Sequence, residues 1–593
     1  MKPAIVTFAA SGAETAARLA PLIGADVHHC GYNGEDGKTL LPRLFADGRP
    51  IIGICAAGIL IRLLAPSLDD KQTEPPVLAV SQDGTQIVPL LGGHHGANRL
   101  AREIATRLAG TAVLTTASDA KFTRGLDDPP PGWVLADPAA AKPAMMALLI
   151  GGKLVLEGHA PWLATAGYPM SFAGTVKVRV DEHTTRRERE LLYHPRTLVA
   201  GIGAERGAAA DEVIALITET LADYDLAPQS LAALATIDIK SDESAFHSAA
   251  AHFGVPLRIF TAAELNQERY RLVNPSATVE AETGTPGVAE AAALKAGTLL
   301  VPKRKSRRAT CAIGRAATPI DPTTLGRAPG LLHVVGVGPG DRASRSAAAV
   351  AALDAASDWV GYDLYLDLVS DLRFGQAEHR FPLGDEEVRV RHALELAATG
   401  KTVALVCSGD AQIYAMASLV YELVEAVGAR KVSEPARRVF VEVHPGISAF
   451  QAASAAAGAL IGHDFACISL SDLLTPTDTI RKRLDAAASG DFVTALYNPR
   501  SQRRTDLLDH AHDVFRAHRP PETPVIIARS LGRPDERVTV TSLAAFDPAT
   551  VDMLTIVLIG ASTSRTIKRG DGTTVAFTPR GYHVKAEPAA SQS

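Results

Sequence analysis

The sequence predicts a multidomain α/β protein, and three of its features support this fold class. The chain has 593 residues, which is too long for a single hydrophobic core. Short apolar runs alternate with longer amphipathic or alanine-rich segments, as they do in α/β layer folds. The apolar run at residues 331–337 ends in Gly-Pro-Gly before an alanine-rich segment, so a further α/β domain begins well inside the chain.

The composition, net charge and cysteine spacing indicate which classes of protein the chain can belong to. Apolar residues make up 47% of the chain and charged residues 21%, as in soluble globular proteins. The net charge of −5 offers no basic surface, so we expect no nucleic-acid partner. Five scattered cysteines without C-x-x-C spacing indicate reduced thiols rather than disulfides or a zinc knuckle. No apolar run reaches about 18 residues, so we expect a cytoplasmic protein without a membrane span.

Residues 1–128 are expected to form the first α/β domain. Its predicted strands are residues 4–9, 50–55, 77–80, 86–91 and 112–116, and its predicted helices are residues 13–23, 59–64 and 98–108. A glycine-rich turn places His94, His95 and Asn98 at a helix start, which suits an anionic group. The same residue types also serve ordinary caps and turns. We expect no metal at these histidines, because no second ligand cluster has recognisable spacing.

The next segments differ in regularity. Residues 129–197 begin with three prolines and are expected to form either a small inserted subdomain or an irregular connector. The α/β alternation resumes over residues 198–315, with predicted strands at 198–203, 234–239 and 257–260 and predicted helices at 211–224 and 288–296. The basic stretch 303–308 is expected to be a solvated loop, with contact to an acidic ligand as the alternative. Three prolines mark residues 316–329 as a linker.

Several blocks of residues 1–315 carry a family resemblance. In chain order they are residues 58–62, 92–98, 115–119 and 201–203, Lys240 with Glu243, residues 288–294, and Thr310. This series resembles the cobalt-precorrin-5A hydrolases of cobalamin biosynthesis, which open a lactone on the macrocycle and release acetaldehyde. One departure is Gly92, where that family more often has serine, so a role for a hydroxyl group there is in doubt.

Lactone opening needs a general base and donors for a developing oxyanion. The resemblance points to His94 and Glu290 for the proton transfers and to Asn98 with the Gly96 and Ala97 amides as donors. For Glu290 the alternative is an ordinary first-turn helix carboxylate. The amino-terminal half as a whole could instead carry substrate without catalysis.

In the domain expected at residues 330–565, small residues follow the carboxyl end of each predicted strand, a position called the strand exit below. The predicted strand 403–407 ends in Ser408-Gly409-Asp410, and the predicted strand 439–443 leads into the segment 444–449. Small residues let a ligand approach the backbone, while Asp410 can accept hydrogen bonds from a ribose or an amino group. Pro339 interrupts the first glycine turn, so no G-x-G-x-x-G dinucleotide fingerprint is present there.

These strand exits resemble the tetrapyrrole methylase family, two α/β lobes that hold S-adenosylmethionine between them. The blocks at residues 463–476, 497–501 and 532–536 resemble its precorrin-3B C17-methyltransferase branch, which methylates C17 and contracts the macrocycle. The resemblance implies S-adenosyl-L-methionine as the methyl donor, a tetrapyrrole substrate and a possible homodimer. It does not say whether the substrate carries cobalt.

The methylase resemblance also assigns residues. The donor-binding set is Gly338, Pro339, Gly340, Ser408, Gly409, Asp410, Ile413, Ser448, Ala449, Tyr497 and Asn498. The substrate-binding set is Asp341, Tyr365, Arg500 and Arg533, with Arg503 and Arg504 as further candidates because guanidinium groups pair with carboxylate arms. The set for proton transfer is His463, Asp464 and Asp472.

Each assignment has an alternative. The arginines can be plain surface charges, and the residues around 469–472 can be caps and turns. Family members often have Gly-Gly-Asp-Pro where this chain has Ser408-Gly-Asp-Ala411. A methylase that acts on RNA or on a protein histidine, and a non-enzymatic nucleotide-binding protein, are the remaining alternatives. Residues 566–593 are expected to be a partly disordered tail.

Overall fold

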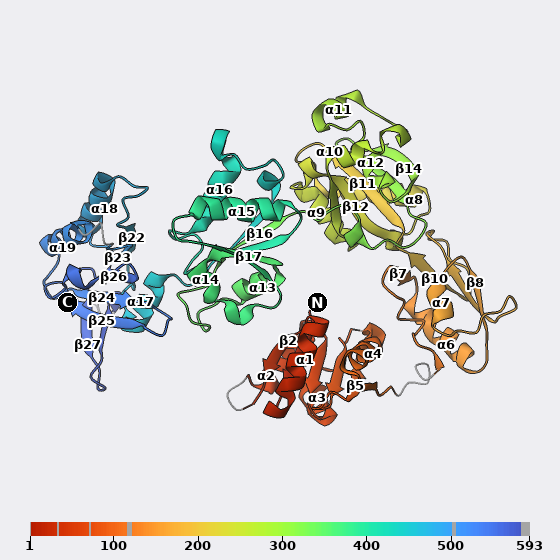
Figure 1. Ribbon diagram of the computed structural model, residues 1–593, viewed down its shortest axis with the longest axis horizontal. Coiled ribbons are helices and arrows are strands. Elements are labelled where there is room, and N and C mark those ends of the chain that lie inside the picture. The colour runs from red at the N-terminus through yellow and green to blue at the C-terminus, as the bar shows by residue number, and fades with distance from the viewer. Residues whose placement is uncertain (1, 32–34, 70–72, 115–120, 501–505, 583–593) are drawn as a thin grey trace, which may run out of the picture. The chain divides into compact units, whose positions relative to one another are not determined.

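The computed structural model describes residues 2–31, 35–69, 73–114, 121–500 and 506–582. The chain divides into two compact units, Met1–Ala328 and Pro329–Ser593. Each unit contains several sheets flanked by helices, which confirms the predicted multidomain α/β class (Figure 1). Over the described residues, no helix is both long enough and apolar enough to span a bilayer.

The first sheet has six strands in the order β2-β1-β3-β4-β5-β6. Its strands are β1 Ala4–Thr7, β2 Asp26–His29, β3 Ile51–Ile54, β4 Val77–Val80, β5 Gln86–Leu91 and β6 Thr111–Ala112. Its helices are α1 Ala13–Ile23, α2 Gly37–Ala46, α3 Ala57–Leu64 and α4 Ala97–Leu108. The central strands are fully buried because helices pack on both faces. The last predicted strand is shorter than expected, and residues 115–120 lie outside the described residues.

The middle segment is a folded layer with its own core, which agrees with the small inserted subdomain expected from the sequence and not with the alternative of an irregular connector. Its sheet has the order β7-β10-β9-β8. The strands are β7 Trp133–Leu135, β8 Leu154–Glu157, β9 Val176–Val180 and β10 Glu190–Pro195, and helices α6 Ala141–Leu149 and α7 Pro161–Thr165 pack against them. Trp162 makes edge contacts with Trp133 and Tyr193, at ring-centroid distances of 6.5 and 5.3 Å. These aromatic side chains supply apolar area that the short strands lack.

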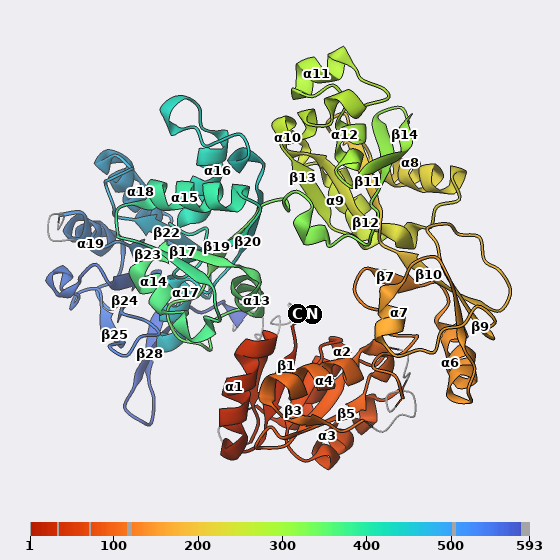
Figure 2. The same ribbon diagram turned by 45° about the vertical axis from the view of Figure 1, so that its right-hand side comes forward.

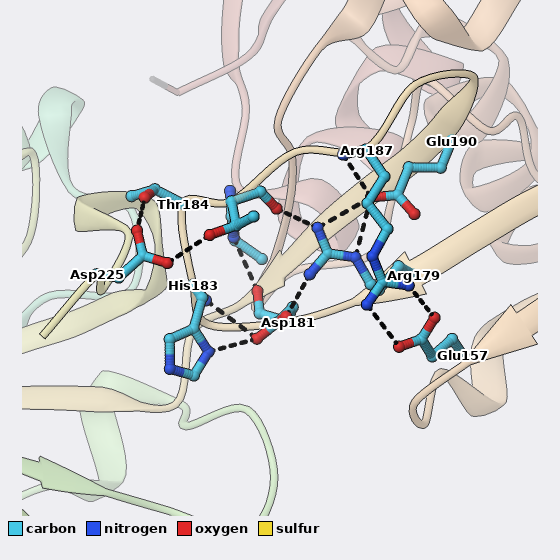
Figure 3. Close-up of polar contacts among 10 residues, drawn as sticks. Glu157, Arg179, Asp181, His183, Thr184, Arg187, Glu190 and Asp225 are labelled. Carbon is cyan, nitrogen blue, oxygen red and sulfur yellow. Dashed lines mark hydrogen bonds and ion pairs between the residues drawn. The ribbon is translucent and has the colours of Figure 1, made fainter.

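A buried arginine stabilises this middle layer. The Arg179 side chain is only 4% exposed and lies on β9 among two carboxylates and a carbonyl group (Figure 3). Its guanidinium donates to Glu190 at 2.9 Å, to Asp181 and to the Thr185 carbonyl oxygen. A buried charge is tolerated only when it is paired and hydrogen-bonded in this way.

The third sheet has the order β13-β12-β11-β15-β14. Its strands are β11 Leu198–Ala204, β12 Leu231–Ile237, β13 Leu257–Phe260, β14 Thr298–Lys305 and β15 Ala309–Arg315. The main helices are α8 Ala210–Asp223, α9 Ser244–Phe253 and the fully buried α12 Val288–Leu294. A methyl group at Gly201 would lie 2.0 Å from the Ala289 carbonyl oxygen, so glycine is needed for α12 to reach the sheet. The basic stretch 303–308 is partly strand, not only loop as predicted.

The second unit begins with a wholly parallel sheet in the order β18-β17-β19-β16-β20. The strands are β16 Leu331–Gly336, β17 Asp358–Tyr362, β18 Ala377–Phe381, β19 Thr402–Cys407 and β20 Phe440–His444. Helices α15 Glu386–Ala398 and α16 Met416–Glu425 cover one face (Figure 2), whereas α13 Ala347–Ala355 and α14 Asp363–Asp367 cover the other. This is the doubly wound arrangement that places ligand sites at the strand carboxyl ends.

The second lobe of this unit has a mixed sheet in the order β22-β23-β26-β24-β25. Its strands are β22 Phe465–Ser469, β23 Val493–Tyr497, β24 Pro524–Arg529, β25 Arg537–Ser542 and β26 Thr555–Ile559. Helices α18 Thr477–Ser489 and α19 Asp506–His518 pack on one face, and α17 Ala449–Ala457 packs on the other.

The expected tail is ordered over much of its length. Strands β27 Arg565–Lys568 and β28 Thr574–Phe577 form a hairpin, and β28 also pairs with β21 Gly458–Ala459. Regular structure thus extends to Phe577 within the stretch where partial disorder is expected. Residues 583–593 lie outside the described residues.

Candidate functional site

Three strand exits converge at the carboxyl edge of the parallel sheet. Gly338, after β16, exchanges two backbone hydrogen bonds with Gly409, after β19, at 3.1 and 2.7 Å. A methyl group at Gly336 would lie 2.7 Å from the Gly409 carbonyl oxygen and 2.8 Å from the Gly446 nitrogen. Glycine is therefore needed for these backbone segments to approach one another so closely.

Asp410 fastens two of these exits together. Its side chain is buried, and its carboxylate accepts hydrogen bonds from the Gln412 N–H at 2.8 Å and the Gly446 N–H at 3.1 Å. Hydrogen bonds to a charged acceptor are among the stronger ones in proteins. The carboxylate therefore shapes the loops, in addition to any bond that it makes to a ligand.

Ser448 and Tyr497 link the parallel sheet to the second lobe. Their hydroxyl groups lie 2.5 Å apart, and the Phe450 N–H donates to the Tyr497 hydroxyl at 3.2 Å. Burial raises the pKa of Tyr497, so its hydroxyl keeps its proton near neutral pH. Asn498 follows with a φ of 49° and donates from Nδ2 to the Ser469 hydroxyl at 3.0 Å.

A cavity of about 450 Å³ lies beside this link. Its lining residues are Gln412, Ile413, Tyr414, Ser418, Phe450, Phe465 and Cys467. The Tyr414 hydroxyl donates to the Cys467 carbonyl oxygen at 2.9 Å, which ties a loop of the first lobe to β22 of the second. A mostly apolar, aromatic cavity of this size suits a small organic ligand such as a nucleoside.

Sequence analysis identified only one of the residues lining this cavity, Ile413. Phe465 and Cys467 are two residues apart on one strand, so their side chains lie on the same face of the sheet. This spacing could have indicated that both line one cavity. Tyr414 carried no such signal, because its place in the cavity depends on the fold of the loop after β19.

Two residues predicted to bind substrate, Asp341 and Arg533, lie on loops that touch. A methyl group at Gly340 would lie 3.1 Å from Arg533 Cγ, and one at Gly532 would lie 2.7 Å from the Asp341 nitrogen. Tyr365 lies on α14, which follows β17, and burial raises the pKa of its phenol. The Arg533 Nε atom is buried without a hydrogen-bond partner among the described residues. A carboxylate ligand would satisfy this donor.

Arg500 lies after β23, at the same edge. Its guanidinium donates to the Pro548 carbonyl oxygen at 3.1 Å and lies 3.4 Å from Asp509. Arg503 and Arg504 lie outside the described residues.

The three residues predicted for proton transfer do not form one set. His463 and Asp464 precede β22, whereas Asp472 follows it, and β22 runs parallel to β23 in the register Phe465↔Val493 to Ser469↔Tyr497. Five residues of strand span about 17 Å, so the two ends are far apart. His463 and Asp464 lie at the end opposite Tyr497, and both side chains are exposed. Only Asp472 lies at the edge with the donor-binding candidates.

The amino-terminal candidates lie on separate sheets. Asn98 is in the first turn of α4, next to the first sheet, and Glu290 is on α12, next to the third. The His94 side chain and the block at 115–119 lie outside the described part of the chain. Gly92 has a φ of 72°, and a methyl group there would lie 2.5 Å from the Pro75 backbone. The departure from serine at this position is therefore enforced by the backbone.

Glu290 is a buried and fully bonded carboxylate. It accepts hydrogen bonds from the backbone N–H groups of Val273 at 2.8 Å, Asn274 at 2.9 Å and Lys303 at 2.9 Å, and from the Asn274 side-chain amide at 2.8 Å. Burial raises the pKa of Glu290, but these bonds outweigh it and hold the pKa below its usual value. The geometry favours a structural anchor, although for a different reason than the helix dipole considered from the sequence.

Comparison with known families identifies three stretches of the chain. Residues 331–547 match the model of the tetrapyrrole (corrin/porphyrin) methylases. Residues 39–119 match the model of the cobalamin synthesis G N-terminal region, and residues 198–314 match that of the cobalamin synthesis G C-terminus. Both resemblances predicted from the sequence are confirmed.

Individual relatives match the second unit. A probable cobalt-factor III C(17)-methyltransferase of Salmonella typhimurium is 41% identical over 252 residues, which are 42% of this chain and 99% of the relative. The cobalamin biosynthesis protein CobIJ of Mycobacterium tuberculosis is 40% identical over 268 residues, 44% of this chain and 51% of that protein. The chain thus spans about half the length of CobIJ.

A solved structure, that of the methyltransferase CobJ, is 37% identical and is covered over its whole length by 42% of this chain, with a TM-score of 0.39. The Salmonella relative is matched over nearly its full length, and the methylase model covers both lobes of the second unit. The chain belongs to the tetrapyrrole methylase family, with segments of the cobalamin synthesis G type preceding its methylase domain.

Proposed function

We propose that the second unit transfers a methyl group from S-adenosyl-L-methionine to C17 of precorrin-3B or its cobalt-bearing counterpart, with contraction of the macrocycle. The convergence of the strand exits at Gly336, Gly409 and Gly446 beside an aromatic cavity supports this proposal, because ligands of doubly wound folds bind at the carboxyl edge of the parallel sheet. The RNA alternative is not favoured, since the named relatives are proteins of cobalamin biosynthesis and tetrapyrrole methylation.

The donor residues fit S-adenosylmethionine. Ile413 in the wall of the cavity, and the loops from Ser408 to Asp410 and from Ser448 to Ala449, would hold it. The donor would supply an electrophilic methyl group on a positively charged sulfur. The task of the chain would then be to align that group with the acceptor carbon.

The acceptor residues fit a ring with carboxylate arms. The unpartnered Arg533 Nε and the Arg500 guanidinium offer donors for carboxylates, and Tyr365 offers a phenol whose pKa burial raises. Asp341 is held in place by the Ser344 N–H at 2.8 Å and the Ser344 hydroxyl at 2.6 Å, and its pKa is lowered chiefly by the hydroxyl bond. Among the titratable residues considered, Asp472 is our candidate for a proton transfer at this edge.

For the amino-terminal half we propose lactone opening on the same pathway, with His94 as the base and Asn98 as an oxyanion donor. Two activities on one labile macrocycle favour fusion, because tethering raises the local concentration of the intermediate. A substrate-carrying role without catalysis is the alternative for this half.

The full chain incubated with methyl-labelled S-adenosylmethionine tests the methyltransferase proposal. Label is expected in the tri-methylated tetrapyrrole, metal-free or cobalt-bearing, and not in RNA offered in parallel. Label in RNA alone would refute it. For the other half, the full chain is expected to release acetaldehyde from a labelled lactone, and His94→Ala is expected to stop this release while methyl transfer continues. No release by the unaltered chain would show that the half is not a hydrolase.

A further inference from the structure

Two histidines and a glutamate meet on neighbouring strands of the parallel sheet. His333 lies on β16, and Glu442 and His444 lie on the edge strand β20. The strands pair in the register His333↔Glu442, and His444 is two residues beyond Glu442. Because side chains alternate along a strand, all three project from the same face of the sheet.

The ligand atoms of these residues converge on one point. His333 Nδ1 lies 3.0 Å from His444 Nε2 and 3.3 Å from a Glu442 carboxylate oxygen, and His444 Nε2 lies 3.8 Å from that oxygen. Tetrahedral zinc with bonds of about 2.0–2.2 Å requires its ligand atoms to be roughly 3.3–3.5 Å apart. The three observed separations bracket this value, so an ion fits with shifts of a few tenths of an ångström.

Burial around the three residues resembles that of a metal site with one open position. The His333 side chain is 7% exposed and that of His444 is 19% exposed, whereas that of Glu442 is 50% exposed. The histidines would thus hold an ion from the sheet side, and the carboxylate side would remain open to water. Three protein ligands with a fourth position open is a common zinc arrangement.

We propose that His333, Glu442 and His444 bind one divalent ion of the class that imidazole and carboxylate ligands prefer, represented by Zn²⁺. His444 is two residues before Gly446, whose N–H donates to Asp410. The ion would therefore fix the end of β20 where the loop toward Ser448 begins. The proposal does not depend on the identity of the methyl acceptor.

A second histidine pair, His379 on strand β18 and His392 on the covering helix α15, provides a matched control. His392 Nε2 lies 3.0 Å from His379 Nδ1, and His379 Nε2 lies 2.9 Å from Asp358. The His379 ring contacts its two neighbours through opposite nitrogens, so the three groups do not converge on one point. The two histidine rings are thus as close, at 3.0 Å between nitrogens, as those of the proposed site, but they lack a third ligand atom at the same point.

The test is a Zn²⁺ titration of the full chain, without a histidine tag and after removal of metals with a chelator. Calorimetry is expected to give one tight site per chain, and Co²⁺ is expected to give the visible absorption of a tetrahedral ion at the same stoichiometry. Loss of a direct ligand in His444→Gln or Glu442→Gln is expected to weaken binding at least about 100-fold, more than the 10–100-fold typical of outer-shell changes. His392→Gln is expected to bind as the unaltered chain does.

Circular dichroism and melting in chelator check that each variant is folded. Glu442 is half-exposed, so its glutamine variant keeps a folded readout even if His444→Gln does not. Two results would overturn the proposal: no saturable Zn²⁺ site in the unaltered chain, or undiminished affinity in the folded Glu442→Gln variant.

Discussion

The backbone segments at Gly336, Gly409 and Gly446 pack against one another at the proposed donor site, an arrangement called the glycine crossing below. Gly446→Ala tests its importance. A methyl group at this position would lie 2.2 Å from the Gly409 carbonyl oxygen and 2.6 Å from that of Gly336. Carbon and oxygen atoms in favourable contact are about 3.5 Å apart, so the crossing must open by roughly 1 Å. Overpacking of this kind costs about 1–3 kcal/mol of folding free energy. A misplacement of about 1 Å can also cost roughly 100-fold in a reaction that depends on alignment.

Calorimetric titration of the full chain with S-adenosylhomocysteine measures donor affinity, and scanning calorimetry measures stability. Gly361→Ala is the matched control, because a methyl group there would meet only side chains, namely Leu366 Cγ and Cδ2 at 3.0 Å and Val406 Cβ at 3.5 Å, and not backbone. We expect near-native affinity in the control and a loss of about tenfold or more in Gly446→Ala. The reasoning is refuted if Gly446→Ala melts as the native chain does and binds within about threefold of its affinity.

Three further predictions concern buried carboxylates and their partners. In Asp410→Asn the side-chain amide turns an N–H donor toward one of two backbone N–H groups. The free energy of unfolding should fall by about 1.5–3 kcal/mol, and S-adenosylhomocysteine binding should weaken. Equal affinity by calorimetry would contradict this prediction. Arg179→Met leaves the Glu190 carboxylate buried without its partner and should destabilise the amino-terminal unit by about 3–5 kcal/mol in denaturant melts. The exposed Arg187→Met should lower the stability of this unit much less than Arg179→Met does, and equal losses would argue against the burial effect. The folded pKa of Glu290 lies below its usual value, so its contribution to stability is present above about pH 4.5 and is lost as pH falls through the folded pKa. Melts at a series of pH values measure this loss of stability at low pH, and Glu290→Gln should reduce it. An unchanged loss in the variant would show that another group is responsible.

The sequence predicted the boundaries of three short strands. Residues 77–80 and 257–260 each begin directly after a proline, and residues 86–91 end at Gly92, so residues typical of turns mark these ends. The middle layer was harder to predict, since its strands have three to six residues and its core depends on aromatic side chains far apart in the sequence.

The sequence could predict those parts of the candidate site that are formed by the backbone of glycine-containing loops. Gly338, Gly409 and the loop after β20 follow from the glycines at the strand exits, because parallel strands end at one edge. The separation of the proposed proton-transfer residues could not be predicted, because His463 and Asp472 are close in sequence and β22 lies between them. The convergence of His333 with His444 was also invisible, because the pairing of β16 with β20 joins residues 111 positions apart.

The most direct test of the central claim is a single product analysis. The full chain is incubated with ¹³C-methyl S-adenosylmethionine and the tri-methylated tetrapyrrole, metal-free in one sample and cobalt-bearing in another. The account predicts a product heavier by one labelled methyl group, with the ¹³C signal on C17 of a contracted ring, in at least one of the two samples. Label on another carbon, or no label in either macrocycle by a chain that binds S-adenosylhomocysteine, would contradict it.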